Sequence, residues 1–254
     1  HFRRDYASAE DIGYKAMIGN VSDIVAMGGS ARYAVISCGL TDDLTSGYVR
    51  RVYEGMIEAA SGAGAHIIGG DLSRSSVLVI SVAMYGEAHP SGAVLRSGAA
   101  AGDRIFCTGI TGDSLAGLEV LNGHDRSLRE KYASLVKAHL RPNCRHDIVT
   151  EIVQHFSPSA MIDVSDGLLI DLGRICRESG CGFRLFREKI RVSSGLREYC
   201  AEKGRDPVEY ALRSGEEYQL IFTTSKDLGE TMQMNINGVP LTCIGEIIES
   251  GHLM

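Results

Sequence analysis

Two aspartates separated by two residues form the stretch with the clearest chemical potential. Asp163 and Asp166 flank Ser165, directly after the apolar residues 160–162. Apolar positions then recur with helical spacing at Leu168, Leu169, Leu172 and Ile175. The pattern therefore places the acids on a strand-to-helix turn, where α/β proteins commonly bind ligands. Two carboxylates this close raise each other's pKa unless a cation lies between them. The alternative is a helix N-cap with a spare acid in the first turn.

A similar stretch occurs in the first half of the chain. The residues Asn20-Val21-Ser22-Asp23 share three positions with 163–166, which is too little to establish an internal repeat. A helix is expected to start after Ser8 and to include this stretch, so Asn20 and Asp23 lie one turn apart and can face one site. Each half of the chain therefore carries similar chemistry.

A third acid follows a glycine pair. His66 to Ile68 is expected to form a short buried strand that leads into Gly69-Gly70-Asp71. Glycines let the backbone approach a ligand closely, and the acid would follow at the strand's end. We therefore include Gly70 and Asp71 among the candidate site residues.

A glycine-rich loop, Thr108 to Ser114, separates an expected strand from an expected helix. A loop of this kind at a helix N-terminus is a candidate anion cradle. It matches neither the P-loop nor the G-x-G-x-x-G pattern. A plain strand-to-helix turn is the alternative, and the sequence leaves both open.

These residues must be positioned by two sets of alternating strands and helices. The expected strands are 32–38, 66–68, 77–85, 104–107, 182–186, 219–223 and 241–248, and the expected helices include one capped by Asp42-Asp43 and those at 128–140 and 146–156. A small-residue stretch from His89 to Gly102 carries Arg96 and favours a domain boundary. We expect two α/β (α+β) domains, 1–95 and 96–254.

Composition excludes several classes of function. The chain has 254 residues and a net charge of −6, which does not favour nucleic acid or an anionic membrane. No apolar run approaches the length of a membrane span. Its seven cysteines lack a zinc or redox spacing and are expected to be reduced thiols in the cytoplasm.

Nine stretches, in order along nearly the whole chain, resemble the thiamine-monophosphate kinases. This family belongs to the ATP-binding superfamily that includes aminoimidazole ribonucleotide synthetase, selenophosphate synthetase and a hydrogenase maturation factor. The matching stretches are 1–2, 13–16, 20–28, 68–71, 96–99, 112–118, 139–142, 162–169 and 214–220.

The resemblance implies an N-terminal domain that dimerises through its sheet, a C-terminal α/β domain, and ATP bound between them. It implies several magnesium ions held by Asp23, Asp71, Asp163 and Asp166. It also implies ATP contacts from Tyr53, Gly70, Asp71, Arg96 and Ser165. Thiamine monophosphate would lie against His1 and Glu216, and the partners would be these two substrates and a second copy of the chain.

The sequence departs from the family pattern in two places. Ser214-Gly215-Glu216-Glu217-Tyr218-Gln219 stands where the family usually has Gly-Gly-Glu-Asp-Tyr-Glu. The family's acidic segment before the His-Phe pair and its aromatic substrate contact near the C-terminus are absent, so we expect the chain to be a fragment.

The residues themselves also suit phosphoryl transfer. Transfer between two phosphates requires positioning and charge neutralisation, and an anionic phosphate acceptor needs no general base. We assign Asp23, Asp71 and Asp166 to catalysis of ATP-dependent phosphorylation of thiamine monophosphate, which yields thiamine diphosphate and ADP. The alternatives are another superfamily enzyme, making aminoimidazole ribonucleotide or selenophosphate, and a non-catalytic nucleotide-binding homologue.

Overall fold

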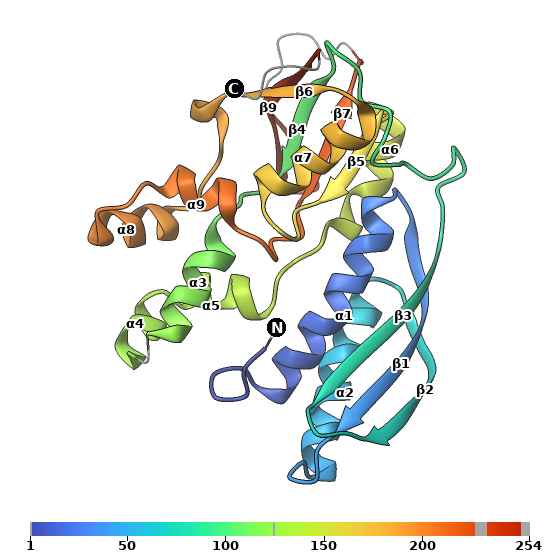
Figure 1. The fold of residues 1–254 in the computed structure, drawn as a ribbon, viewed down its shortest axis with the longest axis vertical. Coiled ribbons are helices and arrows are strands. Elements are labelled where there is room, and N and C mark those ends of the chain that lie inside the picture. The colour runs from blue at the N-terminus through green and yellow to red at the C-terminus, as the bar shows by residue number, and fades with distance from the viewer. Residues whose placement is uncertain (1, 124, 227–232, 250–254) are drawn as a thin grey trace.

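The computed structural model describes residues 2–123, 125–226 and 233–249. The N-terminal half forms a three-stranded sheet with two long helices on one face. The C-terminal half forms a larger sheet with helices around it (Figure 1). The mixed α/β (α+β) class predicted from the sequence is confirmed.

The two N-terminal helices pack closely together because glycines lie where they touch. Helix α1 (Ala9–Ala26) begins at Ser8, whose side chain accepts a hydrogen bond from the Asp11 amide. Helix α2 (Ser46–Gly62) is capped by Thr45, so the predicted cap at Asp42-Asp43 is wrong. A Cβ on Gly55 would lie 1.9 Å from the Glu10 carbonyl oxygen, which only glycine avoids.

Strand β1 (Ser30–Leu40) is the centre of the N-terminal sheet. It pairs in parallel with β2 (His66–Arg74) and antiparallel with β3 (Val79–Glu87). The prediction of a short buried strand at 66–68 is wrong, because β2 has nine residues and almost all are exposed. Asp71 consequently lies inside the strand, opposite Ser37, and not at its end.

The C-terminal sheet is antiparallel throughout its described pairs. Its strand order is β5-β7-β4-β9-β6, and β8 pairs with β9. The strands are β4 (Arg104–Thr108), β5 (Ala160–Asp163), β6 (Gly182–Leu185), β7 (Leu220–Thr224), β8 (Gln233–Ile236) and β9 (Val239–Ile248).

Helices α6 (Val149–Phe156) and α7 (Leu168–Ser179) pack on opposite faces of this sheet. Phe106, Phe156 and Phe222 pack together on the α6 side with ring centroids 5.3 to 5.7 Å apart. The same hydrophobic cluster continues into α1 through Val25. This shared core fixes the end of α1 against β5, where the candidate acids lie.

The remaining helices form a separate layer beside the C-terminal sheet. The helix predicted at 128–140 is two helices, because the backbone at Tyr132 is not helical. Helices α8 and α9 were not predicted. The layer consists of α3 (Asp113–Asn122), α4 (Arg126–Lys131), α5 (Ala133–Leu140), α8 (Ser194–Lys203) and α9 (Pro207–Arg213). Two short 3-10 helices are η1 (Arg145–Asp147) and η2 (Arg187–Lys189).

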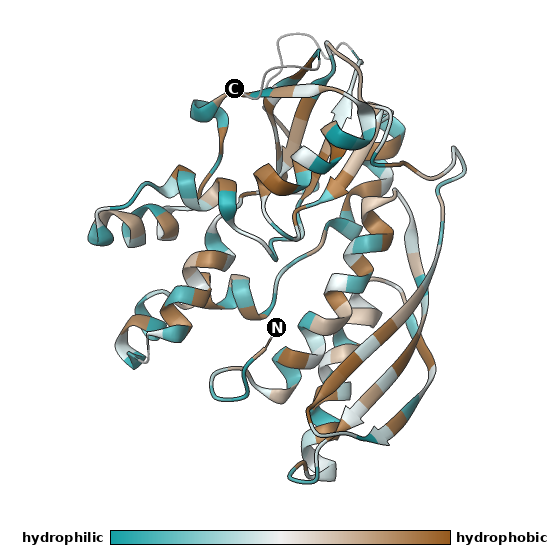
Figure 2. Cartoon of the chain, in the orientation of Figure 1, coloured by the Kyte–Doolittle hydropathy of each residue, from teal (hydrophilic) through white to brown (hydrophobic). Residues whose placement is uncertain are grey.

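Membrane insertion finds no support in the helices. Within residues 2–123, 125–226 and 233–249, none combines the length and the apolar character needed to cross a bilayer. Figure 2 shows hydrophobic residues concentrated in short alternating patches along strands and helices.

Candidate active site

The two similar acidic stretches contact each other in the structure. Ser22 lies in the last turns of α1, and its Oγ donates a 2.6 Å hydrogen bond to Oδ2 of Asp163 at the end of β5. Asp23 is the next residue and is exposed to solvent. The shared core of the two halves therefore brings one acid from each stretch to a common point.

The electrostatics of this pair favour a cation. Asp163 is only 2% exposed, and burial raises the pKa of its carboxyl to about 6, with the Asp23 charge adding to the effect. Although Asp23 remains open to solvent, partial desolvation raises the pKa of its carboxyl, while the nearby Arg96 guanidinium lowers that pKa. A positive ion at this point would stabilise both ionised carboxylates.

Asp166 has a counter-ion of its own in Arg174, which lies nearly two turns into α7. The N-cap position of α7 belongs to Gly167, so neither Asp163 nor Asp166 is the cap. The loop is held by Asp171, whose Oδ2 accepts hydrogen bonds from the amides of Ser165, Asp166 and Gly167 at 3.0, 2.9 and 3.0 Å. Ser165 and Asp166 are thus presented by a fixed backbone.

The segment 214–218 is fastened to this loop. The Glu216 amide donates to the Ser165 carbonyl at 2.8 Å, and the Tyr218 amide donates to the Val164 carbonyl at 2.9 Å. Glu216 and Tyr218 both have left-handed backbone angles, with φ of 55° and 52°. Such conformations cost free energy and persist where neighbouring contacts enforce them.

Tyr218 marks the point where the carboxylates converge. Burial raises the pKa of its hydroxyl, and the charges of four surrounding acids raise it further; these are Glu216, Asp163, Asp23 and Asp166. We call the residues Asp23, Arg96, Asp163, Ser165, Asp166 and Glu216 the Asp23 cluster. All six are among the residues predicted from the sequence.

The glycine-rich loop binds an anion that the chain itself supplies. Oε1 of Glu217 accepts hydrogen bonds from the amides of Gly112 and Ser114 at 2.7 and 3.0 Å, at the start of α3. Ser214 Oγ also donates to this oxygen, at 2.5 Å. Burial raises the pKa of Glu217 to about 7. Two of the three departures from the family pattern in this segment, Ser214 and Glu217, therefore contact each other, and the glycine-rich loop is a structural turn.

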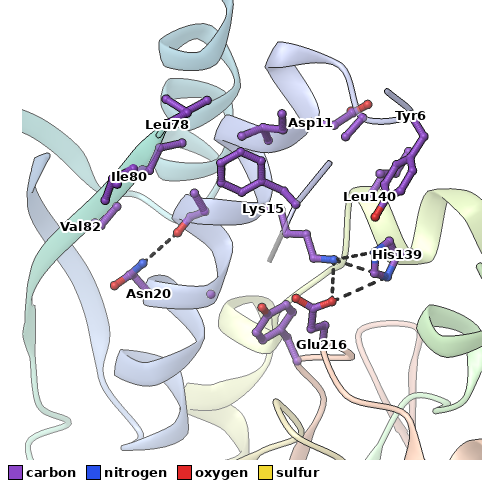
Figure 3. A pocket seen from close by; sticks show the side chains of 17 residues that line it. Tyr6, Asp11, Lys15, Asn20, Leu78, Ile80, Val82, His139, Leu140 and Glu216 are labelled. Atoms are coloured by element: carbon purple, nitrogen blue, oxygen red, sulfur yellow. Dashed lines mark hydrogen bonds and ion pairs between the residues drawn. The ribbon is translucent and has the colours of Figure 1, made fainter. Parts of the chain in front are cut away.

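A cavity of about 450 Å³ lies beside the Asp23 cluster, between α1 and β3 on one side and residues 139–140 and 216–218 on the other. Figure 3 shows Lys15 pointing across it toward His139 and Glu216. Lys15 and His139 are 124 positions apart, so sequence spacing could not join them. Both lie in stretches that resemble the family, which was the available signal.

Three predicted ATP contacts lie elsewhere in the chain. Asp71 is on β2, where its Oδ2 accepts a 2.6 Å hydrogen bond from Ser73 Oγ. Gly70 precedes it, and a Cβ there would lie 2.0 Å from the Ile36 carbonyl oxygen. Tyr53 lies under the sheet with its hydroxyl 3.9 Å from Cys38 Sγ, and burial raises its pKa to about 12.

Within a single chain, Tyr53, Gly70 and Asp71 lie away from the Asp23 cluster. Helix α1 packs on β3 and β1, whereas α2 packs on β2, the opposite edge of the sheet (Figure 1). His1, the other predicted substrate contact, lies outside the described residues.

The donor set is compatible with magnesium, which prefers oxygen ligands and often takes one or two carboxylates together with substrate phosphates. Within the part of the chain that the structure describes, no group of three or more acidic, histidine or cysteine side chains forms a ready metal cage. Asp23 and Asp163 would therefore share the ion with phosphate oxygens.

The fold and the site define a class first. Residues 1–88 match the family model for the N-terminal domain of AIR synthase related proteins, and residues 100–253 match the model for their C-terminal domain. The protein is thus a two-domain member of the AIR synthase related class.

Closer comparisons define the family. The chain is 40% identical to a thiamine-monophosphate kinase from Aquifex aeolicus, over 89% of this chain and 72% of that protein. It is 34% identical to a thiamine-monophosphate kinase from Rhodopirellula baltica, over 97% of this chain and 72% of that protein. The solved structure of AaThiL complexed with AMPPCP and TMP superimposes with a TM-score of 0.89, at 38% identity and covering 98% of this chain and 77% of that one. The chain belongs to the thiamine-monophosphate kinase family.

Proposed function

We propose that this protein transfers the γ-phosphoryl group of ATP to thiamine monophosphate, giving thiamine diphosphate and ADP. The observation that supports this most is the contact of Ser22, the neighbour of Asp23, with Asp163, beside a cavity of about 450 Å³ that Glu216 lines. A family relative has been solved with an ATP analogue and TMP bound. The cavity, with Glu216 in its wall, is the place for the acceptor, and the other residues of the Asp23 cluster are the place for the phosphates.

The residues of the Asp23 cluster would act by positioning and by charge. Arg96 offers a guanidinium near Asp23, suited to an ATP phosphate because its donors form a planar fork. Ser165 is presented by the loop that Asp171 holds. Since the attacking phosphate oxygen is already anionic, the chain needs no general base.

Asp23, Asp163 and Asp166 are the residues we assign to magnesium in this half of the site. When bound, magnesium supplies neutralisation of the two phosphate chains and of the charge that develops between them. Burial beside Asp23 raises the pKa of Asp163, and this supports a positive ion at the pair.

We further propose that a second copy of the chain completes the site with Asp71. The outer face of the N-terminal sheet carries exposed large apolar side chains, namely Tyr33, Val35, Ile68, Val79 and Tyr85. Monomers rarely expose a contiguous apolar sheet face, and two copies of this face would cover each other. Pairing in this way provides a route for Gly70 and Asp71 on β2 of one chain to reach the Asp23 cluster of the partner chain. The seven free thiols are compatible with a cytoplasmic location.

The assay is direct. Purified protein, ATP and magnesium are incubated with thiamine monophosphate, and ADP and thiamine diphosphate are quantified by chromatography. We expect equal amounts of the two products. Product from aminoimidazole or selenide substrates but not from thiamine monophosphate would identify a different superfamily enzyme. ATP binding without ADP formation from any acceptor would identify a non-catalytic homologue.

A further inference from the structure

Lys15 places a buried ammonium in the wall of the cavity. It lies in the middle of α1, and its side chain is only 13% exposed. Its Nζ is 2.8 Å from Oε2 of Glu216 and 3.2 Å from Nε2 of His139. Glu216, by contrast, is 36% exposed, so its carboxylate faces the cavity as well as Lys15.

His139 supports this pair as a neutral acceptor. It is almost fully buried, and burial together with the Lys15 charge lowers the pKa of its imidazole to about 4. Ser114 Oγ lies 3.1 Å from Nδ1. We assign the ring hydrogen to Nδ1, facing Ser114, which leaves Nε2 to accept from Lys15. The Lys15 ammonium therefore has two partners, the Nε2 atom of His139 and the carboxylate of Glu216.

The rest of the wall is largely apolar. Figure 3 shows Leu78, Ile80 and Val82 of the β3 region on one side of the cavity, and the aromatic rings of Phe2, Tyr6 and Tyr218 also line it. A cavity with apolar walls and a few placed polar groups is typical of a small-molecule site that fixes the orientation of a ring. Among the polar side chains of this wall, Lys15 and Glu216 present a donor and an acceptor side by side.

Thiamine has an aminopyrimidine ring in which an amino group, a donor, is bonded next to a ring nitrogen, an acceptor. We propose that Lys15 is a specificity-determining residue, which donates to this ring nitrogen while Glu216 accepts from the adjacent amino group. The inference rests on the proposed function and concerns how the same cavity selects its acceptor substrate. His139 is a positioning residue, because it acts through Lys15.

A purely structural ion pair explains the arrangement less well. Desolvating an ammonium is costly, and apolar residues of similar size often stabilise a protein as well or better. Burial lowers the pKa of the Lys15 ammonium and the Glu216 carboxylate at 2.8 Å raises it, so the pair stands beside a neutral histidine at the edge of a cavity. A ligand that contacts both Lys15 as donor and Glu216 as acceptor would explain why the ammonium lies here.

The test compares thiamine monophosphate with oxythiamine monophosphate, in which the amino group is replaced by an oxo group and the ring nitrogen carries hydrogen. That change exchanges donor and acceptor, so Lys15 and Glu216 would both face like groups. We expect wild-type protein to prefer thiamine monophosphate by at least about a hundredfold in kcat/KM, because unpaired buried polar groups discriminate strongly. Equal use of both substrates by the wild-type protein would overturn the inference without any variant.

The substitution Lys15→Met keeps the length of the side chain and removes the donor. We expect the KM for thiamine monophosphate to rise about tenfold or more, the KM for ATP to stay within twofold, and the preference over the oxo analogue to shrink. Lys131→Met is a matched control, because Lys131 forms exposed ion pairs with Glu198 and Glu202. An unchanged KM and preference in Lys15→Met, with thiamine diphosphate still formed, would refute the role of Lys15 and leave the proposed function intact. No thiamine diphosphate from the wild-type protein would refute the proposed function itself.

Discussion

Asp163 illustrates how one buried carboxyl links stability to ligand binding. Its folded-state pKa is raised from 3.8 to about 6, chiefly by burial. A carboxyl whose pKa is raised on folding stabilises the protein only while it is protonated. Its contribution is fully present below pH 3.8 and is lost as the pH rises through about 6. The apo protein at pH 8 therefore holds a buried charge without a counter-ion.

We predict that Asp163→Asn removes this penalty. At pH 8 the melting temperature without ligands should rise, with a gain in unfolding free energy on the order of 3 kcal/mol or less. The gain should vanish near pH 4, where the wild-type carboxyl is protonated. Asn can still accept the hydrogen bond from Ser22. Thermal melts across pH 4 to 8 measure the difference, and a gain that is the same at every pH would contradict the explanation.

The same substitution should abolish most of the stabilisation that magnesium and ATP together give, because that gain requires binding to the folded state. Asp166 differs from Asp163 in having a counter-ion in the ligand-free chain. Arg174 already pairs with Asp166, so the sequence-based expectation of repulsion at Asp166 does not describe the ligand-free chain. The buried Asp163 carboxyl carries the larger penalty, because the Arg96 guanidinium lowers the pKa of Asp23.

At the scale of elements, the turn between β5 and α7 depends on Asp171. This side chain is fully buried and accepts hydrogen bonds from three successive amides. Burial raises its pKa, and these amides lower it. An oxygen that satisfies three backbone donors holds the turn in one conformation, which in turn sets the positions of Ser165 and Asp166.

We predict that Asp171→Ala lowers the unfolding free energy by about 1–3 kcal/mol, because three backbone amides, one of them buried, lose their acceptor. The KM for ATP should rise and turnover should fall at least tenfold. Asp171→Asn keeps one acceptor oxygen and should restore much of both. Steady-state kinetics at a temperature where all variants are folded separates positioning from folding. If Ala and Asn variants lose stability but keep the wild-type KM and turnover, the turn does not position the site.

At the scale of the whole molecule, the predicted site residues divide between two surfaces. The Asp23 cluster gathers where α1 meets β5, while Asp71 lies on the exposed edge strand β2. The sheet between them is covered by helices on its inner face and bears exposed apolar side chains on its outer face.

Co-expression of two inactive variants tests the proposed dimer. Asp71→Asn and Asp166→Asn chains with different tags are purified as mixed dimers. If the two residues of one site come from different chains, each mixed dimer regains one intact site of two, about half the wild-type activity. If both residues of a site come from one chain, each site keeps one defect and activity stays at the level of the single variants. Sedimentation of the wild-type protein as a monomer would also rule out the dimer.

The sequence by itself determined the class, the main helices and most strands, and the identity of the acids. Local patterns were enough for these because helical spacing, caps and apolar runs act over a few residues, as at Ser8 and at Leu168 to Ile175. Motif order along the chain was enough for the family. The exposed strand β2 was mistaken for a buried one because its apolar and glycine composition does not reveal which face a partner would cover.

Only the tertiary structure decided which residues meet. Ser22 and Asp163 are 141 positions apart, and the shared core between α1 and β5 brings them to 2.6 Å. Lys15, His139 and Glu216 join for the same reason. The acceptor at the glycine-rich loop is Glu217, a buried carboxyl from a distant segment that accepts hydrogen bonds from the amides of Gly112 and Ser114. Contacts of this kind depend on packing between distant segments, which no local pattern encodes.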